Sequence, residues 1–244
     1  MIGRLPSVSI VGLLVVMSSV RAAHAISACE GEDGWSPQSG SVLPPRARIA
    51  YWTDDGDDAL QFSVKLDGKA VAIKTTKVVS KPYVIRVIEI DSARTGTLEV
   101  SVKTPHGAPQ KLTYTIKRGV TFAKQAKATT SRYHKKIPHT SVREVFDGLA
   151  IAVNVPALYA HVKIRRDAQS QWRELDVPLV DGKTARIGEI GCASNYTPQL
   201  LEQGVDIEAT VMTPAGSQIP IAGLTRVTLP KLAKPTGTRP SDDE

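Results

Sequence analysis

The chain has 244 residues and a formal net charge of +7, from 31 basic and 24 acidic residues. Beyond one short apolar run near the start, no stretch approaches the roughly eighteen apolar residues that a membrane-spanning helix requires, which excludes a protein built on transmembrane helices. The length is sufficient for two domains of about 100 residues, each able to bury its own core.

Residues 1–25 have the features of a secretory signal peptide. Arg4 supplies the positive charge ahead of an apolar run, and Ala23-His24-Ala25 provides the small-residue cleavage pattern. A competing interpretation is a lipobox at residues 26–29, which would make Cys29 a lipidated first residue. We expect a secreted or periplasmic protein with no transmembrane segment.

Removal of the signal peptide changes the charge only slightly. Two of the 31 basic residues and none of the 24 acidic ones lie in it, so the mature chain keeps a net charge of +5. A mildly basic surface favours anionic partners without identifying one.

Only two cysteines, Cys29 and Cys192, remain in a chain bound for an oxidising compartment. We expect a disulfide between them, which would hold the N-terminal segment against the second half of the chain. The alternative is a buried free Cys192 with a mobile or modified Cys29.

Residues 26–118 read as a first β-domain with an N-terminal extension. After Pro44-Pro45, which opposes helix, apolar and polar residues alternate in short runs. These runs predict strands over residues 46–53, 62–66, 71–75, 83–90, 98–102 and 112–116. The run at 83–90 is apolar on both faces, which predicts a central position in a sheet. Asp67-Gly68 indicates a two-residue hairpin turn.

Four carboxylates lie within the five residues Asp54 to Asp58. Calcium needs several oxygen ligands converging on one loop, but the spacing departs from the calcium-loop pattern. A solvated loop between two strands is the alternative that we favour.

Residues 119–143 break the strand pattern and read as a basic crossing segment between domains, with no regular structure beyond one possible edge strand. No acidic residue occurs between Glu99 and Glu144. A basic run of this kind is a candidate for binding polyanions, with Tyr133 and His134 as stacking groups, although such runs are usually only solvated. The candidate polyanion-binding residues are Lys117, Arg118, Lys124, Lys127, Arg132, Lys135 and Lys136. An anionic polysaccharide or cell surface fits an exported protein better than nucleic acid does.

Residues 144–232 read as a second β-domain. Alternation predicts strands over residues 149–155, 160–164, 175–179, 186–190, 205–213 and 219–229. Residues 233–244 contain proline, glycine and charge, and are predicted to be a disordered tail.

The two halves contain related segments, which is the strongest signal in the sequence. Residues 98–107 (LEVSVKTPHG) correspond to residues 207–216 (IEATVMTPAG) at an offset of 109, and both end in Thr-Pro-x-Gly. Residues 86–90 (RVIEI) correspond to residues 186–190 (RIGEI) at an offset of 100. The difference predicts nine inserted residues between 190 and 207.

Leu200 followed by Gly204 and an alternating strand resembles the corner before the sixth strand in fibronectin type III and bacterial immunoglobulin-like domains. The resemblance implies an all-β fold of two tandem antiparallel immunoglobulin-like β-sandwiches. The first half departs from it, with residues 93–96 (ARTG) in place of the Leu-x-x-x-Gly corner. Neither half has the internal cysteine pair and strand tryptophan of antibody-type domains.

No sequence motif indicates catalysis, a metal or a cofactor. His134 and His139 lack further ligands at metal-binding spacing, and a Cys192 nucleophile with His161 as base is disfavoured by the expected disulfide. We therefore expect a non-enzymatic binding or structural module whose partner is an unidentified protein or an anionic polysaccharide. A secreted inhibitor or ligand-binding accessory factor is the alternative, and a hydrolase with an interdomain cleft is third.

Overall fold

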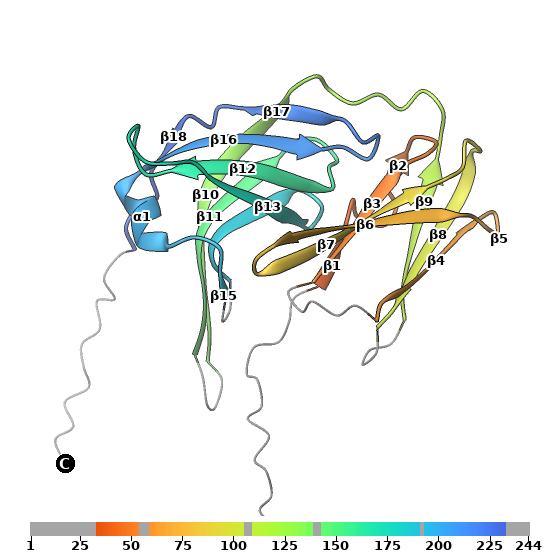
Figure 1. The fold of residues 1–244 in the computed structure, drawn as a ribbon, viewed down its shortest axis with the longest axis horizontal. Helices are drawn as coiled ribbons and strands as arrows, with labels where there is room; N and C mark the ends of the chain where they lie inside the picture. Colours follow the sequence, from red (N-terminus) through yellow and green to blue (C-terminus); the bar gives the residue numbers. More distant parts are fainter. Residues whose placement is uncertain (1–32, 54–58, 105–108, 139–142, 191–192, 233–244) are drawn as a thin grey trace, which may run out of the picture.

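The structure is a computed structural model that describes residues 33–53, 59–104, 109–138, 143–190 and 193–232. Strands joined by short connections make up almost all of it, with the helix α1 (Pro198–Gln203) as the one helix of these residues (Figure 1). The all-β prediction is therefore confirmed. The expected signal peptide, both cysteines, the Asp54–Asp58 loop, His139 and the expected tail lie outside the described residues.

The N-terminal half forms two sheets. One has the order β1-β3-β7-β6 and the other the order β2-β9-β8-β4-β5. Their strands are β1 (Asp33–Ser36), β2 (Val42–Leu43), β3 (Arg48–Thr53), β4 (Gln61–Leu66), β5 (Lys69–Ala70), β6 (Ile73–Ser80), β7 (Tyr83–Ile90), β8 (Gly96–Lys103) and β9 (Gln110–Ile116). With the strands taken in chain order, this is the ABED and GFC arrangement of an immunoglobulin-like sandwich, with short additional edge strands.

Alternation along these strands produces the core of this half. Val64 and Leu66 of β4 are buried while Ser63 and Lys65 are exposed, as the pattern predicts. β7 lies between β3 and β6, which explains why it is apolar on both faces. Asp67 and Gly68 both have positive φ, which confirms the predicted hairpin turn.

The C-terminal half closes into a barrel instead of two separate sheets. The order β11-β10-β17-β16-β12-β13-β14 is closed by pairing between β11 and β14. Its strands are β10 (Ala126–Pro138), β11 (Arg143–Val153), β12 (Tyr159–Arg165), β13 (Arg173–Val180), β14 (Thr184–Ile190), β15 (Ala193–Ser194), β16 (Val205–Met212), β17 (Gln218–Ala222) and β18 (Arg226–Val227). The expectation of two face-to-face sheets is thus wrong in detail for this half.

Strand β13 allows the closure because it pairs first with one neighbouring strand and then with another. Residues up to Pro178 pair with β12, whereas Leu179 and Val180 pair with β14. Proline has no N–H to donate to a ladder, so it suits the point at which a strand changes partners. Among the described strands of the N-terminal half, β6 pairs with β7 alone, and the two sheets stay separate.

The two halves share one strand arrangement. β3 pairs with β7 as β11 pairs with β14, and β4 pairs with β8 as β12 pairs with β16. Two short pairings are parallel instead of antiparallel, and they too correspond, β2 with β9 and β10 with β17. Val102 and Val211, at the offset of 109, are both fully buried in the cores of their own halves.

The predicted insertion is also present. Five residues separate β7 from β8, whereas fourteen separate β14 from β16, a difference of nine. The longer connection contains β15 and α1, and Leu201 of α1 is buried in the barrel core. Gly204 ends the helix with positive φ, so the corner that the sequence suggests is a short helix.

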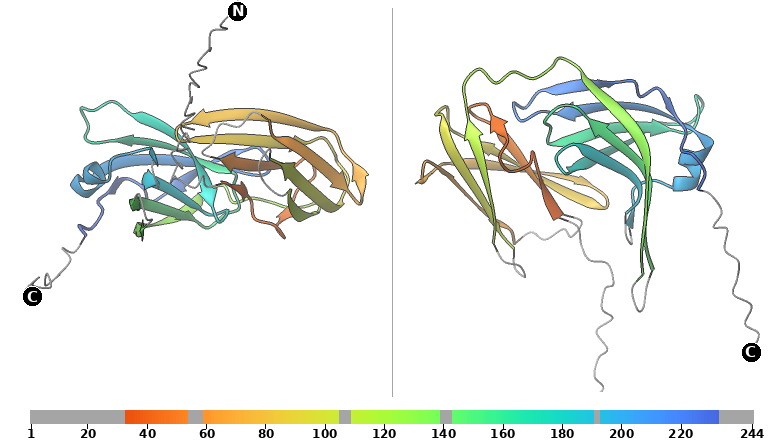
Figure 2. Two further views of the ribbon diagram at one scale, coloured as in Figure 1. Left: turned by 90° about the horizontal axis from the view of Figure 1, so that it is seen from below. Right: turned by 180° about the vertical axis from the view of Figure 1, so that it is seen from behind.

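The halves lie side by side, joined by a third buried cluster (Figures 1 and 2). From the N-terminal half it contains Ala50, Trp52, Tyr83 and Ile85, and from the C-terminal half Leu158 and Tyr159. We call this cluster the junction.

Hydrogen bonds between the halves border the junction. The Arg48 N–H donates to the Pro214 carbonyl at 2.7 Å, and the Asp176 N–H donates to the Ser80 hydroxyl at 2.8 Å. Pro214 belongs to the Thr-Pro-x-Gly turn of the second repeat, where the Gly216 N–H donates to the Thr213 carbonyl at 2.9 Å. The turn that ends the repeat thus also contacts the other half.

The segment that the sequence predicts as a crossing, residues 119–143, contains one long strand. Residues 126–138 form β10, which pairs with the full length of β11 and, in parallel, with β17. The connection without regular structure is residues 117–125, which runs from one half to the other (Figure 1). β10 is rich in Thr, Ser and Lys and has little apolar alternation. Backbone hydrogen bonds to its neighbouring strands, more than burial of apolar side chains, therefore keep it extended.

Candidate functional site

Four of the predicted polyanion-binding residues are exposed. Lys117 and Arg118 follow β9, Lys124 precedes β10, and Lys127 is the second residue of β10. Their charges therefore flank the connection between the halves. Exposure permits contact with a polyanion, and it is equally compatible with simple solvation.

Arg132 has a structural position that the sequence analysis does not anticipate. Its guanidinium donates to both carboxylate oxygens of Asp147, at 2.8 and 2.6 Å, and to Glu202 at 2.6 Å. The side chain is only 9% exposed. The donors of Arg132 are thus occupied by carboxylates of the protein itself, and its role in binding a polyanion stays a prediction.

The remaining two predicted residues are placed by backbone register alone. Lys135 and Lys136 of β10 lie opposite Phe146 and Val145 of β11. Their side chains lie outside what the structure describes. By backbone position, the seven predicted residues are thus divided between the connection, the paired start of β10 and its later part.

A more regular arrangement of charges lies on the outward face of the barrel strands β13, β12 and β16. Side chains that alternate away from the core come into register across the three strands. Two rows run Asp176–His161–Thr210 and Glu174–Lys163–Glu208, and a third runs Arg165–Asp206–Arg226 with β18. We call these three rows the charged face.

A hydrogen bond in the first row and an ion pair in the second join neighbouring strands. His161 Nδ1 lies 2.9 Å from Asp176 Oδ1, and Lys163 Nζ lies 3.0 Å from Glu174 Oε1. The hydrogen bond from Lys163 lowers the pKa of Glu174. Cys192 lies outside the described residues, so the disfavoured dyad with His161 stays untested.

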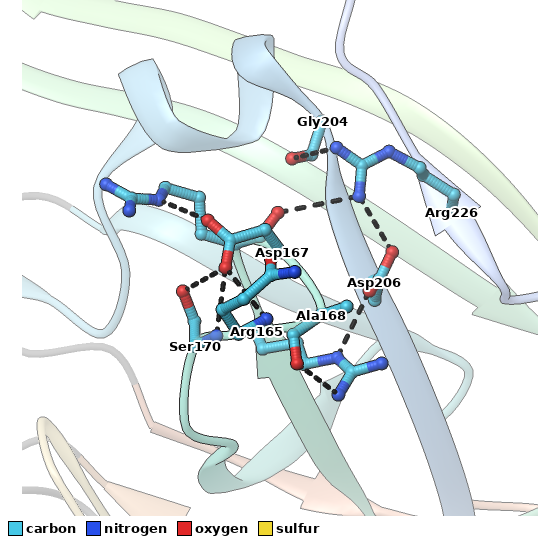
Figure 3. A network of polar contacts seen from close by, with 9 residues as sticks. Arg165, Asp167, Ala168, Ser170, Gly204, Asp206 and Arg226 are labelled. Atoms are coloured by element: carbon cyan, nitrogen blue, oxygen red, sulfur yellow. Dashed lines mark hydrogen bonds and ion pairs between the residues drawn. The ribbon is translucent and has the colours of Figure 1, made fainter.

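The third row belongs to a network of polar contacts beside α1 (Figure 3). Asp206 accepts from Arg226 at 2.8 Å and from Arg165 at 3.1 Å, and these hydrogen bonds lower its pKa. The Arg165 guanidinium also stacks over Trp172, 4.4 Å from the ring centroid.

The loop that connects β12 to β13 is organised by Asp167. Its carboxylate accepts from the Ser170 hydroxyl at 2.7 Å and from Arg166 at 2.9 Å (Figure 3). The hydrogen bond from Ser170, followed by that from Arg166, lowers the pKa of Asp167 to about 2. The loop at the end of the charged face is therefore held in place by the ionised carboxylate of Asp167.

A hollow of about 290 Å³ opens beside the charged face, where β17 leaves β16. The two strands pair as far as Thr210 and Pro220, after which β17 turns to pair with β10 at Ile221. The hollow is lined by polar and basic side chains and by apolar ones, namely His161, Lys163, Glu208, Ala209, Thr210, Pro220, Ile221 and Leu224. We call it the β16–β17 hollow.

Among the residues that the structure describes, no group of three or more His, Cys, Asp or Glu side chains is placed to hold a metal ion. Within the same residues, no helix has the length and apolar character needed to cross a bilayer.

No protein-family model matches the chain, and no curated protein matches it by sequence. Among solved structures, dimeric latent PorU from Porphyromonas gingivalis aligns at 11% identity with a TM-score of 0.31, over 81% of this chain but only 20% of PorU.

The N-terminal Ig1-2 module of the Drosophila receptor protein tyrosine phosphatase DLAR aligns at 13% identity with a TM-score of 0.26, over 79% of this chain and 98% of that module. Salmonella alpha-2-macroglobulin aligns at 16% identity with a TM-score of 0.27, over 79% of this chain and 15% of that protein. The immunoglobulin-like assignment rests on the strand order of β1–β9 rather than on these likenesses.

Proposed function

We propose that this protein is an exported, non-enzymatic module of the cell envelope or extracellular space, made of two tandem immunoglobulin-like domains, which binds a protein partner through the charged face. The observation that carries the proposal is the order of that face. Two rows of mostly ionisable side chains are in register across β13, β12 and β16, and a third row is in register across β12, β16 and β18.

Order matters because a partner then meets charges whose positions are already fixed. Surface ion pairs contribute little to stability, typically below about 1 kcal/mol each. Complementary charges at an interface chiefly set specificity and association rate. An organised set of charges on a sheet face is therefore better suited to recognition than to holding the fold together.

The junction supports the same proposal. Buried Trp52, Tyr83 and Leu158 join the halves through apolar contact. A large apolar contact between domains restricts their relative motion, so a partner would meet one rigid body. Preorganisation of this kind lowers the entropic cost of association.

A secreted ligand-binding accessory factor is the alternative function, and the β16–β17 hollow is the observation that favours it. The exposed Lys117, Arg118, Lys124 and Lys127 would serve a polysaccharide partner instead. These alternatives give different outcomes in the tests below.

The charged face can be tested by photo-crosslinking in cells of the organism that produces the protein. A photoreactive amino acid replaces Lys163 on β12. In a matched control it replaces Lys65 on β4. The positions are equivalent, because Lys65 lies opposite Glu99 and Lys163 lies opposite Glu208. We expect a discrete protein adduct from position 163 and none from position 65. The same adducts from both positions, or none from either, would contradict binding at this face.

Export and the disulfide are tested on the same material by mass spectrometry. The mature chain is expected to begin at Ile26 and to lose two hydrogens on forming the bond between Cys29 and Cys192. An intact N-terminus would contradict export, a lipid adduct on Cys29 would support the lipobox, and free thiols on both cysteines would contradict the bridge.

A further inference from the structure

The β16–β17 hollow has a counterpart in the N-terminal half. There a hollow of about 360 Å³ is lined chiefly by Ser63, Lys65, Glu99, Ser101, Pro109 and Lys111. Glu99 and Ser101 of β8 correspond to Glu208 and Thr210 of β16 at the offset of 109 that relates the repeats. We call it the β8–β9 hollow.

Strand register confirms that the two hollows are equivalent. Lys65 lies opposite Glu99 as Lys163 lies opposite Glu208. On the other side, Lys111 lies opposite Ser101 as Pro220 lies opposite Thr210. The same place in the strand arrangement therefore carries a lysine in one half and a proline in the other.

This difference determines whether the carboxylate in each hollow has an ion-pair partner on the neighbouring strand. Lys111 Nζ lies 2.9 Å from Glu99 Oε2, and its hydrogen bond and charge lower the pKa of Glu99. Glu208 makes no hydrogen bond or ion pair with any described residue. The nearby Lys163 is already engaged by Glu174 at 3.0 Å.

Two more features of the β16–β17 hollow match a ligand that is cationic at one end and apolar along its length. The Thr210 hydroxyl is buried and has no hydrogen-bond partner among the described residues, and an unsatisfied buried hydroxyl is costly. Ile221 and Leu224 are buried apolar lining residues, which suit the methylene stem of a long amine. A volume of about 290 Å³ suits one side chain, because pockets for larger ligands span roughly 300–1,000 Å³.

We propose that the β16–β17 hollow binds an aliphatic ammonium group, that of a lysine side chain of the partner, which contacts Glu208 and Thr210 in the way that Lys111 contacts Glu99 within the chain. The identification of the occupant rests on the proposed function, since it makes the lysine part of a protein partner. The ammonium supplies three donors, of which Glu208 accepts one. The Thr210 hydroxyl, which is buried in the free protein, accepts another after its side chain rotates toward the hollow.

The test titrates the mature protein with Nα-acetyl-lysine N-methylamide and follows backbone amide resonances of β16 by NMR. The neutral control probe is Nα-acetyl-norleucine N-methylamide, which keeps the apolar stem and lacks the charge. We expect saturable shifts at Ala209 and Thr210 with the lysine probe, and binding of the norleucine probe weaker by about fivefold or more. Equal binding of the two probes, or no binding of either, overturns the proposal.

Reciprocal variants use the equivalence of the two hollows. Pro220→Lys places an internal ammonium next to Glu208 and is expected to abolish binding of the lysine probe, as is Glu208→Gln. Lys111→Ala frees Glu99 and is expected to create a second, weak site at β8. Unchanged binding in Glu208→Gln contradicts the proposal, provided that its thermal unfolding midpoint matches that of the parent.

The probes are free small molecules, so this result does not depend on any partner. Binding of the lysine probe without crosslinking at position 163 would retain the cation site and reject the proposed function. Crosslinking at position 163 with no probe binding would do the reverse.

Discussion

Two glycines face each other where strands β11 and β14 approach most closely. Gly148 and Gly188 are register partners, and Gly188 has a φ of 145°, which side chains disfavour. A Cβ on Gly188 would overlap the Asp147 carbonyl, and one on Gly148 would overlap the Ile187 carbonyl. Both overlaps are with backbone, so neither can be relieved by rotating a side chain.

We expect Gly188→Ala to lower the free energy of unfolding by about 2 to 4 kcal/mol, because it combines backbone strain with overpacking. Urea denaturation followed by circular dichroism measures the change. Gly223→Ala is the matched control, since Gly223 also has positive φ but its Cβ would meet nothing within 4 Å. The free energy of unfolding of that variant should fall by only about 1 kcal/mol. Equal losses in both variants would show that the close approach of β11 and β14 does not make Gly188 special.

Individual residues also mark where sequence reasoning fails. Arg132 lies in a run without acidic residues, which suggests a free cation, yet it is neutralised by Asp147 and Glu202. Glu202 comes from α1, seventy residues away, and only the fold brings it close. The unpaired Glu208 could have been found from sequence, because the repeat offset of 109 aligns Lys111 with Pro220.

Among the elements, those with strict alternation were predictable and those defined by pairing were not. β4, β8 and β16 follow from their apolar alternation, β7 follows from its continuous apolar run, and the repeat correctly relates β8 to β16. β10 could not be predicted well, because its Thr-rich and Lys-rich sequence is fixed by ladders to β11 and β17. The closure through β13 was missed for the same reason: a change of partner at Pro178 leaves no periodic signal.

The structure of β10 changes where a protease should cut. Trypsin needs an extended segment free of ladder hydrogen bonds. The Lys117 N–H donates to the Leu43 carbonyl, but residues 118–125 lie between the strands, whereas β10 pairs with β17 at Ala126 and Lys127 and with β11 from Ala128 onward. Within the described residues 109–138, we therefore expect the first cleavage after Arg118 or Lys124, measured by mass spectrometry of early fragments. Earlier cleavage after Lys127 or Arg132 would show that β10 opens more readily than its pairing indicates.

The loop between β12 and β13 predicts a dependence of stability on pH. Hydrogen bonds lower the pKa of Asp167 from 3.8 to about 2 on folding. A lowered carboxyl pKa contributes stability that is complete above the unfolded value and is lost as the pH falls through the folded value. We expect the urea midpoint to fall between about pH 4 and pH 2, and to fall less steeply in Asp167→Asn. An identical slope in that variant would mean that other carboxylates determine the acid response.

At the scale of the whole molecule, the junction decides whether the two halves behave as separate domains. Each half has its own core, which would allow independent unfolding. The junction opposes this, because buried residues of both halves would be exposed if one half unfolded alone. Leu158 is central to this contact: its side chain is fully buried, and its N–H donates to the Met212 carbonyl at 2.7 Å.

We therefore expect one calorimetric unfolding transition for the mature protein and two for Leu158→Ala. The substitution removes buried apolar volume at the junction and is expected to lower the free energy of unfolding by about 2 to 5 kcal/mol. Val100→Ala is the control, since Val100 is equally buried but lies in the core of the N-terminal half. In that variant the single transition should move to lower temperature without splitting, because the intact junction still transmits the loss to the other half. Two transitions in the parent protein would show that the halves unfold independently, and a partner would then meet two linked domains instead of one rigid body.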